Sequence, residues 1–171
     1  MRVFLVLLTI AFLVCACTDR GGATAAFDNG LAAAKRFDYQ EAIQQFTQAI
    51  KIDPNYAQAY GNRGVLYAKL GDRSRAIADY TQAIKIDPKY AMPYYNRGVS
   101  YGMLGDHSRA IADFTQAIKI DPNEADAYNN RGASYIDLRD YKNATQDARK
   151  ACELGDCGLL QVLGKNGWIQ D

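Results

Sequence analysis

The chain has 171 residues, of which 49% are hydrophobic and 23% are charged, and its formal net charge is +1. This length and composition suit a single soluble domain that is large enough to bury a core. A net charge so close to zero excludes the strong basic field of a nucleic-acid-binding protein, and a single histidine with four cysteines leaves little material for a metal site.

The first residues predict a targeting segment. They read MRVFLVLLTIAFLVCACTDR, with one positive charge at Arg2 and an uncharged, largely apolar run from Val3 to Val14. The run is shorter than the roughly 20 residues of a membrane-spanning helix, and its length matches the apolar region of a secretory signal. The following LVCAC resembles a bacterial lipobox, which implies a signal peptide over residues 1–16 and acylation of Cys17. An ordinary cleaved signal or an uncleaved anchor is the alternative.

The lipoprotein resemblance implies where the domain is held. A single acyl chain binds a membrane only marginally, so stable anchoring takes more than one chain, as bacterial lipoproteins carry. Residues 17–22 would then form a short tether at the cell envelope, facing the periplasm or the exterior. Thr18 follows the cysteine in place of the aspartate that retains such lipoproteins at the inner membrane. The outer membrane is therefore favoured if the organism has one.

From residue 23 onward the chain repeats itself every 34 residues. RAIADYTQAIKIDP, which begins at Arg75, returns as RAIADFTQAIKIDP at Arg109. Within this stretch Ala76, Ile77 and Tyr80 are spaced by three and four residues, as on the apolar face of an amphipathic helix. The repeat continues without insertion or deletion, and its four units cover residues 23–56, 57–90, 91–124 and 125–158.

Each unit also contains the signals that end and start helices. The LGD motif at Leu70–Asp72 places a glycine where a helix ends in the left-handed conformation, and an aspartate that can cap the next helix. The DP pair at Asp87–Pro88 ends the second helix, because proline disfavours helix in the residue before it. One unit is therefore predicted to be helix, turn, helix, turn. Arg139 replaces the glycine in unit four, which should cost about 1 kcal/mol if the position is left-handed.

The order of small, glycine, aromatic, alanine and proline positions resembles the tetratricopeptide repeat (TPR). Units two and three fit the pattern fully, while unit four has Ala148 and Asp156 in place of the second-helix aromatic residue and the proline. Unit one has Ala26 and Ala33 where tyrosines stand elsewhere. The resemblance implies an all-α fold, a right-handed α-solenoid of four helix-turn-helix units, in which stacked units share one core.

A stack of this kind needs a closing element, which residues 159–171 supply as a capping helix and tail. The helix is predicted over about residues 158–165, with Trp168 over its end. The residues expected to cover unit four are Leu159, Leu160, Val162 and Leu163.

Comparison of the units predicts a structural ion pair in each of units two to four. An arginine at the seventh position is matched by an aspartate at the twenty-third, and unit one loses both charges together, with Asn29 and Gln45. A row of arginines that binds an anionic ligand is the weaker alternative, because each arginine has an acid supplied. The predicted pairs are Arg63 with Asp79, Arg97 with Asp113, and Arg131 with Asp147.

Cys152 and Cys157 remain once the leader is removed and Cys17 is acylated. An exported chain permits a disulfide, and Gly155 supplies a bend between the two cysteines. A structural bridge worth about 2 kcal/mol is one possibility, and two free buried thiols are the other.

The TPR resemblance implies that the first helix of each unit lines a concave groove. Asparagines recur there at Asn62, Asn96 and Asn130, and an asparagine offers both a donor and an acceptor to a peptide backbone. Some of them could instead brace neighbouring helices. The groove residues implied by position are Phe27, Leu31, Asn62, Val65, Lys69, Met92, Tyr95, Asn96, Val99, Met103, Asn129, Asn130 and Ile136.

The sequence contains no nucleophile–base pair, paired carboxylates, metal-ligand spacing or phosphate loop, so we expect neither an enzyme nor a cofactor. The expected partner is a protein or peptide, with membrane attachment through the lipid anchor, and with no nucleic acid or small-molecule substrate. The expected function is a membrane-tethered adaptor that supports assembly of an envelope complex. The alternative is a structural TPR module that self-associates. Gly61 and Val65 stand where the chaperone-tail subclass of TPRs needs a lysine and an asparagine, so that specificity is not expected.

Overall fold

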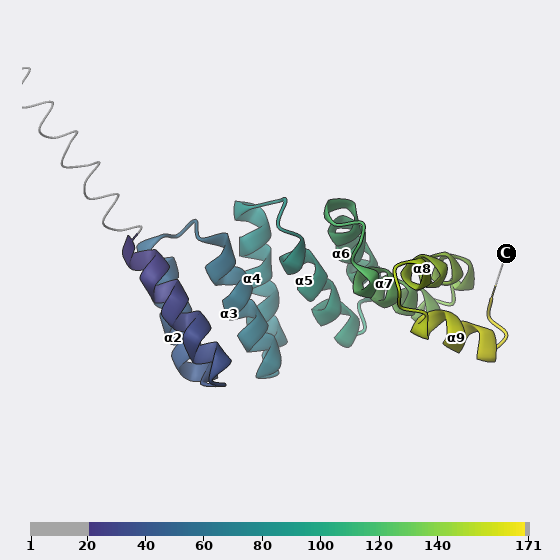
Figure 1. Cartoon of the computed structure of the whole chain (residues 1–171), viewed down its shortest axis with the longest axis horizontal. Coiled ribbons are helices and arrows are strands. Elements are labelled where there is room, and N and C mark those ends of the chain that lie inside the picture. The colour runs from purple at the N-terminus through teal and green to yellow at the C-terminus, as the bar shows by residue number, and fades with distance from the viewer. Residues whose placement is uncertain (1–20, 170–171) are drawn as a thin grey trace, which may run out of the picture.

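The computed structural model describes residues 21–169, and these residues form an all-α stack (Figure 1). Residues 1–20 and 170–171, including Cys17, lie outside the described part. Between residues 21 and 169 there is no strand, so the predicted all-α fold is confirmed. After a helix over residues 21–35 come α2 (Tyr39–Ile52), α3 (Ala57–Lys69), α4 (Arg73–Ile86), α5 (Ala91–Met103), α6 (His107–Ile120), α7 (Ala125–Asp137), α8 (Tyr141–Glu153) and α9 (Gly158–Lys165).

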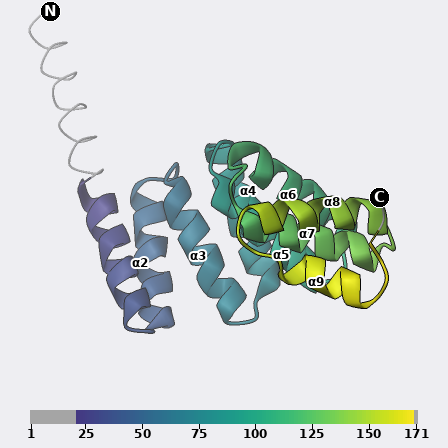
Figure 2. The same cartoon turned by 45° about the vertical axis from the view of Figure 1, so that its right-hand side comes forward.

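The helices pair into hairpins that follow one another in chain order (Figures 1 and 2). Within a unit, α3 packs on α4, α5 on α6 and α7 on α8. Between units, the first helices also contact one another, α3 with α5 and α5 with α7, which places them on the inner side of the curved stack. The helices α3, α5 and α7 begin at Ala57, Ala91 and Ala125, the first residues of units two to four. Residues 21 and 22, expected in the tether, are already helical.

An aspartate side chain starts each second helix. Asp72 accepts a hydrogen bond from the backbone N–H of Arg75 at 3.0 Å, which satisfies one of the free donors of the first turn. This bond, together with the Arg75 side chain, holds the pKa of Asp72 below its usual value. Asp38, Asp106 and Asp140 cap their helices in the same way.

The turn before each aspartate requires a residue with positive φ. Gly71 and Gly105 have φ of 83° and 79°, and Arg139 takes the same conformation with φ of 61°. Phe37, at the equivalent position of unit one, has φ of 63°, which the sequence analysis did not anticipate. Two of the four turns are therefore strained.

In each of the first three hairpins an aromatic ring packs against a glycine in the core. A Cβ atom on Gly64 would lie 2.7 Å from the ring of Tyr80, so no larger residue fits there. Gly30 and Gly98 meet Phe46 and Phe114 in the same way. In unit four, where Ala148 replaces the ring, the capping helix supplies the missing group. A Cβ on Gly132 would lie 2.6 Å from Leu159 of α9.

The capping helix lies over the end of unit four. Leu163 is fully buried, Leu159 and Leu160 pack beside it, and the ring of Trp168 lies 5.1 Å from that of Tyr141. The expectation that Val162 joins this contact is wrong, because its residue is 47% exposed. Residues 159, 160 and 163 share one side of a helix, whereas residue 162 falls to the side of that face.

Candidate functional site

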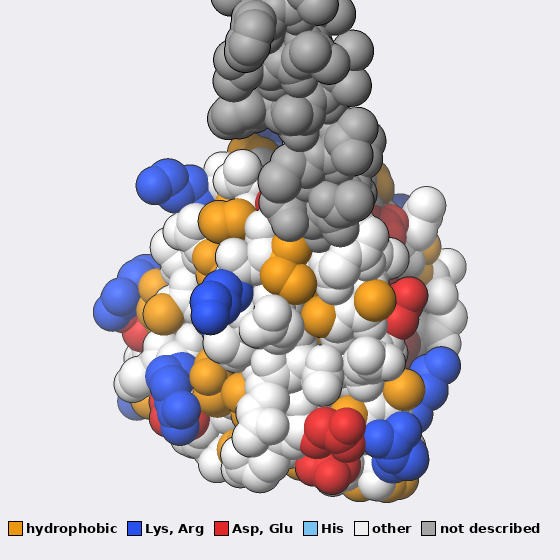
Figure 3. All heavy atoms as spheres, turned by 90° about the vertical axis from the view of Figure 1, so that its left-hand side faces the viewer, with side chains coloured by type: hydrophobic (Ala, Val, Ile, Leu, Met, Phe, Trp, Pro, Cys, Tyr) orange, Lys and Arg blue, Asp and Glu red, His pale blue; other side chains and the backbone are white. Residues whose placement is uncertain are grey.

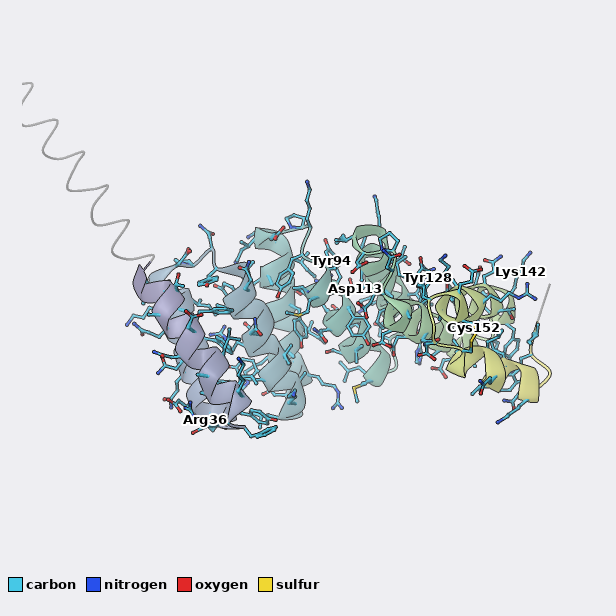
Figure 4. The ribbon with its side chains drawn as sticks, in the orientation of Figure 1. Arg36, Tyr94, Asp113, Tyr128, Lys142 and Cys152 are labelled. Carbon is cyan, nitrogen blue, oxygen red and sulfur yellow. A yellow bond between two sulfur atoms is a disulfide. The ribbon has the colours of Figure 1, made fainter. Side chains whose placement is uncertain are left out.

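The predicted arginines and aspartates meet within each unit. The Nε and Nη2 atoms of Arg97 each donate to a carboxylate oxygen of Asp113 at 2.8 Å, and Asp113 is only 6% exposed. This hydrogen bonding raises the pKa of Arg97. Figure 4 labels Asp113 near the middle of the stack.

Each of these arginines also makes a bond that the sequence analysis missed. The remaining Nη1 atom of Arg97 donates to the hydroxyl of Thr81, in the preceding unit, at 2.9 Å. The guanidinium therefore connects two units, and each of its three nitrogens donates to a partner within the protein. The same arrangement joins Arg63 to Asp79 and Thr47, and Arg131 to Asp147 and Thr115.

Cys152 and Cys157 form a disulfide in the structure, with their Cα atoms 4.0 Å apart. The bridge joins the last turn of α8 to the start of α9 (Figure 4). It therefore holds the capping helix close to unit four.

Three of the expected groove residues contribute to the core. The ring of Phe27 lies 4.9 Å from that of Tyr56 and 5.5 Å from that of Phe46. Leu31 packs in the cluster around Phe46, and Ile136 packs in the cluster around Leu163. Each of the three offers only part of its surface to a ligand.

The asparagines of the groove differ in what they bind. Asn62 donates to the carbonyl of Gln58 in its own helix at 2.8 Å. Asn130 donates to the carbonyl of Asp126 and to the Tyr95 hydroxyl, which braces α7 against α5. The side chain of Asn96 makes no hydrogen bond to any residue between 21 and 169.

Asn129, a further predicted groove residue, is tied to the end of unit four. Its amide donates to a carboxylate oxygen of Asp156 at 2.5 Å. Its Oδ1 atom is buried and has no hydrogen-bond partner among the described residues.

Two hollows lie along α5. One, of about 260 Å³, lies at the start of α5, against the end of α6 and the turn before α7. The other, of about 210 Å³, lies at the end of α5, in the seam between α5 and α7 on the inner side of the stack. Met103 stands at the second hollow with 65% of its residue exposed. The first hollow is lined by Ala91, Met92, Tyr95, Ala117, Asp121 and Glu124, and the second by Val99, Gly102, Met103, His107, Phe114, Asn130, Ala133, Ser134 and Asp137.

Toward unit two the predicted groove becomes more polar. Val65 is half-buried, and Lys69 is exposed with its Nζ atom 5.8 Å from the centre of the Tyr39 ring.

Four of the predicted groove residues line the two hollows. Met92 and Tyr95 line the first hollow, and Val99 and Met103 line the second. Asp137, which holds a groove position of unit four by its place in the repeat, lines the second hollow as expected, whereas His107 and Ala133 line it without having been assigned to the groove. The small residues Gly102 and Ala133 were a usable signal, since they leave space between two helices.

Over residues 21–169 no group of histidine, cysteine and acidic side chains could hold a metal ion. None of the helices in this range has the length and apolar character needed to cross a membrane.

Comparison with known proteins gives matches along most of the solenoid. A tetratricopeptide repeat model matches residues 57–90 and 91–124, the second and third units, and further models of the repeat match residues 30–71 and 114–146. Comparison with curated proteins gave no match.

Solved structures of similar fold include a crystal structure of MamA, with 27% identity and a TM-score of 0.72 over 77% of each chain. The TPR domain of OM64 from Arabidopsis is 27% identical with a TM-score of 0.67, over 69% of this chain and 98% of that one. The first TPR domain of Spaghetti (RPAP3), bound to an HSP90 peptide, is 24% identical with a TM-score of 0.69, over 70% of this chain and 95% of that one, and this likeness concerns the fold alone. The matching models, the stacked hairpins and these relatives together confirm the predicted resemblance. The chain belongs to the tetratricopeptide repeat family, and its fold is that of a protein-interaction scaffold.

Proposed function

We propose that the protein is a membrane-anchored adaptor that binds a peptide segment or protein partner along the inner seam of α5 and α7, and so supports assembly of an envelope complex. The observation that carries this proposal is the amide of Asn96. It has no hydrogen-bond partner among the described residues, and it follows Tyr95 on a helix with a hollow at each end.

An extended segment laid along α5 would use each part of this surface. The Asn96 amide can donate to and accept from a peptide backbone at once. Apolar side chains of the segment would enter the two hollows, where Met92, Tyr95 and Met103 supply contact area. Methionine and tyrosine suit this role, because a thioether adapts its shape and a tyrosine ring buries a large surface at little entropic cost.

The arginines leave little room for an anion-binding function. Arg63, Arg97 and Arg131 each place three nitrogens on partners inside the protein. An anionic ligand would have to displace a buried carboxylate from each arginine. The arginine row is therefore a poor binding surface, and the proposal places recognition at the seam.

The location of the adaptor is proposed from the leader sequence. Acylation of Cys17 would hold the domain at the envelope, with the outer membrane favoured. Only residues 18–20 separate Cys17 from the described helix, which starts at residue 21. Such a tether spans at most about 14 Å, so the partner should also lie at the membrane surface.

A photo-crosslinking experiment tests the binding surface. Benzoylphenylalanine at Met103 should trap one defined partner in intact cells, and the same probe at Gln116, on the outer helix α6, should not. Tyr95→Ala combined with Val99→Ser should remove the trapped product while circular dichroism shows unchanged helicity. A product from Gln116 alone, or one that survives the double substitution, would place binding on another face.

One observation favours the second candidate, a self-associating module. The turns between first and second helices expose Phe37, Leu70, Leu104 and Leu138 by 78, 47, 59 and 49% along one edge. By contrast, on the visible part of the end that carries the first helix, apolar side chains form small separate groups between charged ones (Figure 3). Light scattering over a concentration series separates the candidates, since a monomer at every concentration contradicts self-association.

A further inference from the structure

We infer that the seam selects a partner segment carrying a lysine or arginine, whose aliphatic stem enters the hollow at the end of α5 and whose cation pairs with Asp137. This inference rests on the proposed function and names the chemistry that the seam recognises.

The hollow at the end of α5 has the shape for a long side chain. Val99, Met103 and Phe114 form apolar walls, against which a methylene stem can pack while its charged head reaches the rim. Two small residues keep it open. Gly102 stands where unit two has Ala68, and Ala133 stands where unit three has Val99. A Cβ on Gly102 would meet nothing closer than Ala110, at 3.9 Å, so this wall is uncrowded.

The one carboxylate of this hollow accepts no hydrogen bond from residues 21–169. The side chain of Asp137 is 58% exposed, and its nearest ionisable neighbour within the described range is His107, with Nδ1 and Oδ2 3.4 Å apart. That approach does not have the geometry of a hydrogen bond, and the Nδ1 atom is buried without a partner among residues 21–169. A cationic head group that donates to the exposed carboxylate would supply the partner that Asp137 lacks.

The charges along the inner side favour a cation at this end. At the thirteenth position of the units the residues are Lys35, Lys69, Met103 and Asp137, so the sign reverses from the first units to the last. Asp121 and Glu124 line the hollow at the start of α5. Burial and then the charges of Asp126 and Glu124 raise the pKa of Tyr95, which lies between the two hollows.

A cation of the solenoid also lies at the rim of the second hollow, where the Nη2 atom of Arg73 is 3.7 Å from the sulfur of Met103. Asp137 lines the second hollow, and Asp121 and Glu124 line the first. Both hollows along α5 therefore contain acidic groups, and acidic groups attract a basic partner.

A peptide array tests the inference with the purified full chain in detergent micelles. The probes are end-capped decapeptides of randomised sequence, and the readout is the enrichment of each residue type at each position among captured peptides. We expect lysine and arginine to be enriched about fivefold at one position, which corresponds to a single partly exposed ion pair. Asp137→Asn should abolish this enrichment and leave the preference for apolar residues at neighbouring positions.

Two further variants locate the effect. Ala133→Leu should also abolish the enrichment by filling the hollow, and it should fold, because Ala133 is exposed and Leu31 occupies the same position in unit one. Asp28→Asn removes a carboxylate from the first unit and should keep the enrichment. Captured peptides without a basic preference would overturn this inference and leave seam binding in place. Enrichment that survives both Asp137→Asn and Ala133→Leu would also overturn it, and a complete absence of capture would contradict it together with the proposed function.

Discussion

Arg63, Arg97 and Arg131 each combine two tasks in one side chain. Two nitrogens hold a buried aspartate of the same unit, and the third holds a threonine of the unit before. A guanidinium suits both tasks, because its fork matches a carboxylate and still leaves a donor free. The ion pair fixes a hairpin and the threonine bond fixes how two hairpins stack.

Replacement of Arg97 should therefore weaken the stack more than its charge suggests. Arg97→Ala leaves the carboxylate of Asp113 buried without its partner, which should cost about 3 kcal/mol in the free energy of unfolding. Thr81→Val keeps the ion pair and removes the bond between units together with the bond from the hydroxyl to the Ile77 carbonyl, and it should cost about 1 kcal/mol. Urea denaturation followed by circular dichroism measures both. Arg75→Ala, which breaks an exposed pair with Asp72, should leave the midpoint close to wild type, and an equal loss there would contradict this account.

The turn at Arg139 stores strain that one substitution should relieve. Arg139→Gly removes the clash of a Cβ atom at φ of 61° and should raise the free energy of unfolding by about 1 kcal/mol. Gly105→Ala, at φ of 79°, should lower it by a similar amount. Thermal denaturation of both variants checks the sign, and a gain in both would show that the backbone conformation does not decide the effect.

At the residue scale the sequence predicted those contacts within a unit whose two residues both recur every 34 residues. The period located Arg97 and Asp113 on facing helices, because both recur together. It did not locate the bond from Arg97 to Thr81, since that bond depends on how one unit stacks on the next. Phe37 was missed because phenylalanine does not signal a left-handed turn. Its alignment with Gly71 and Gly105 did contain that information.

The capping helix α9 completes a unit that is incomplete by itself. Unit four lacks the aromatic ring that fills the hairpin elsewhere, and Leu159 occupies that space beside Gly132. The predicted bounds of α9 agree with the structure, since leucines at helical spacing are visible in the sequence. The orientation of Val162 was not predictable, because two possible faces of so short a helix are both apolar.

Two neighbouring substitutions in α9 should differ sharply. Leu163→Ala leaves a cavity at a fully buried site and should cost about 3 kcal/mol. Val162→Ala, where the residue is 47% exposed, should change the free energy of unfolding by no more than about 0.5 kcal/mol. Guanidinium denaturation compares them directly. Similar losses would mean that α9 packs through a different face.

For the molecule as a whole, the leader predicts attachment to a membrane. Cys17→Ser should move the protein from the membrane fraction to the soluble fraction and remove the mass of the acyl chains. Cys15→Ser is the matched control and should remain membrane-bound, because Cys17 is still present. Fractionation with intact-mass spectrometry reads out both variants, and a soluble wild-type chain would refute the anchor.

The series of arginine–threonine bonds between units ends at unit four. At the repeat position of Thr47, Thr81 and Thr115, this unit has Arg149. A tandem copy of residues 57–90 or 91–124 would bring its own arginine and its own threonine, and both new joints would close. A further unit placed after the fourth would set its arginine beside Arg149 instead of a threonine. Two like charges would then meet where the other units form a hydrogen bond. A unit copied from the interior would therefore keep every arginine–threonine bond, whereas a unit added after the fourth would lack one unless Arg149 were changed to threonine.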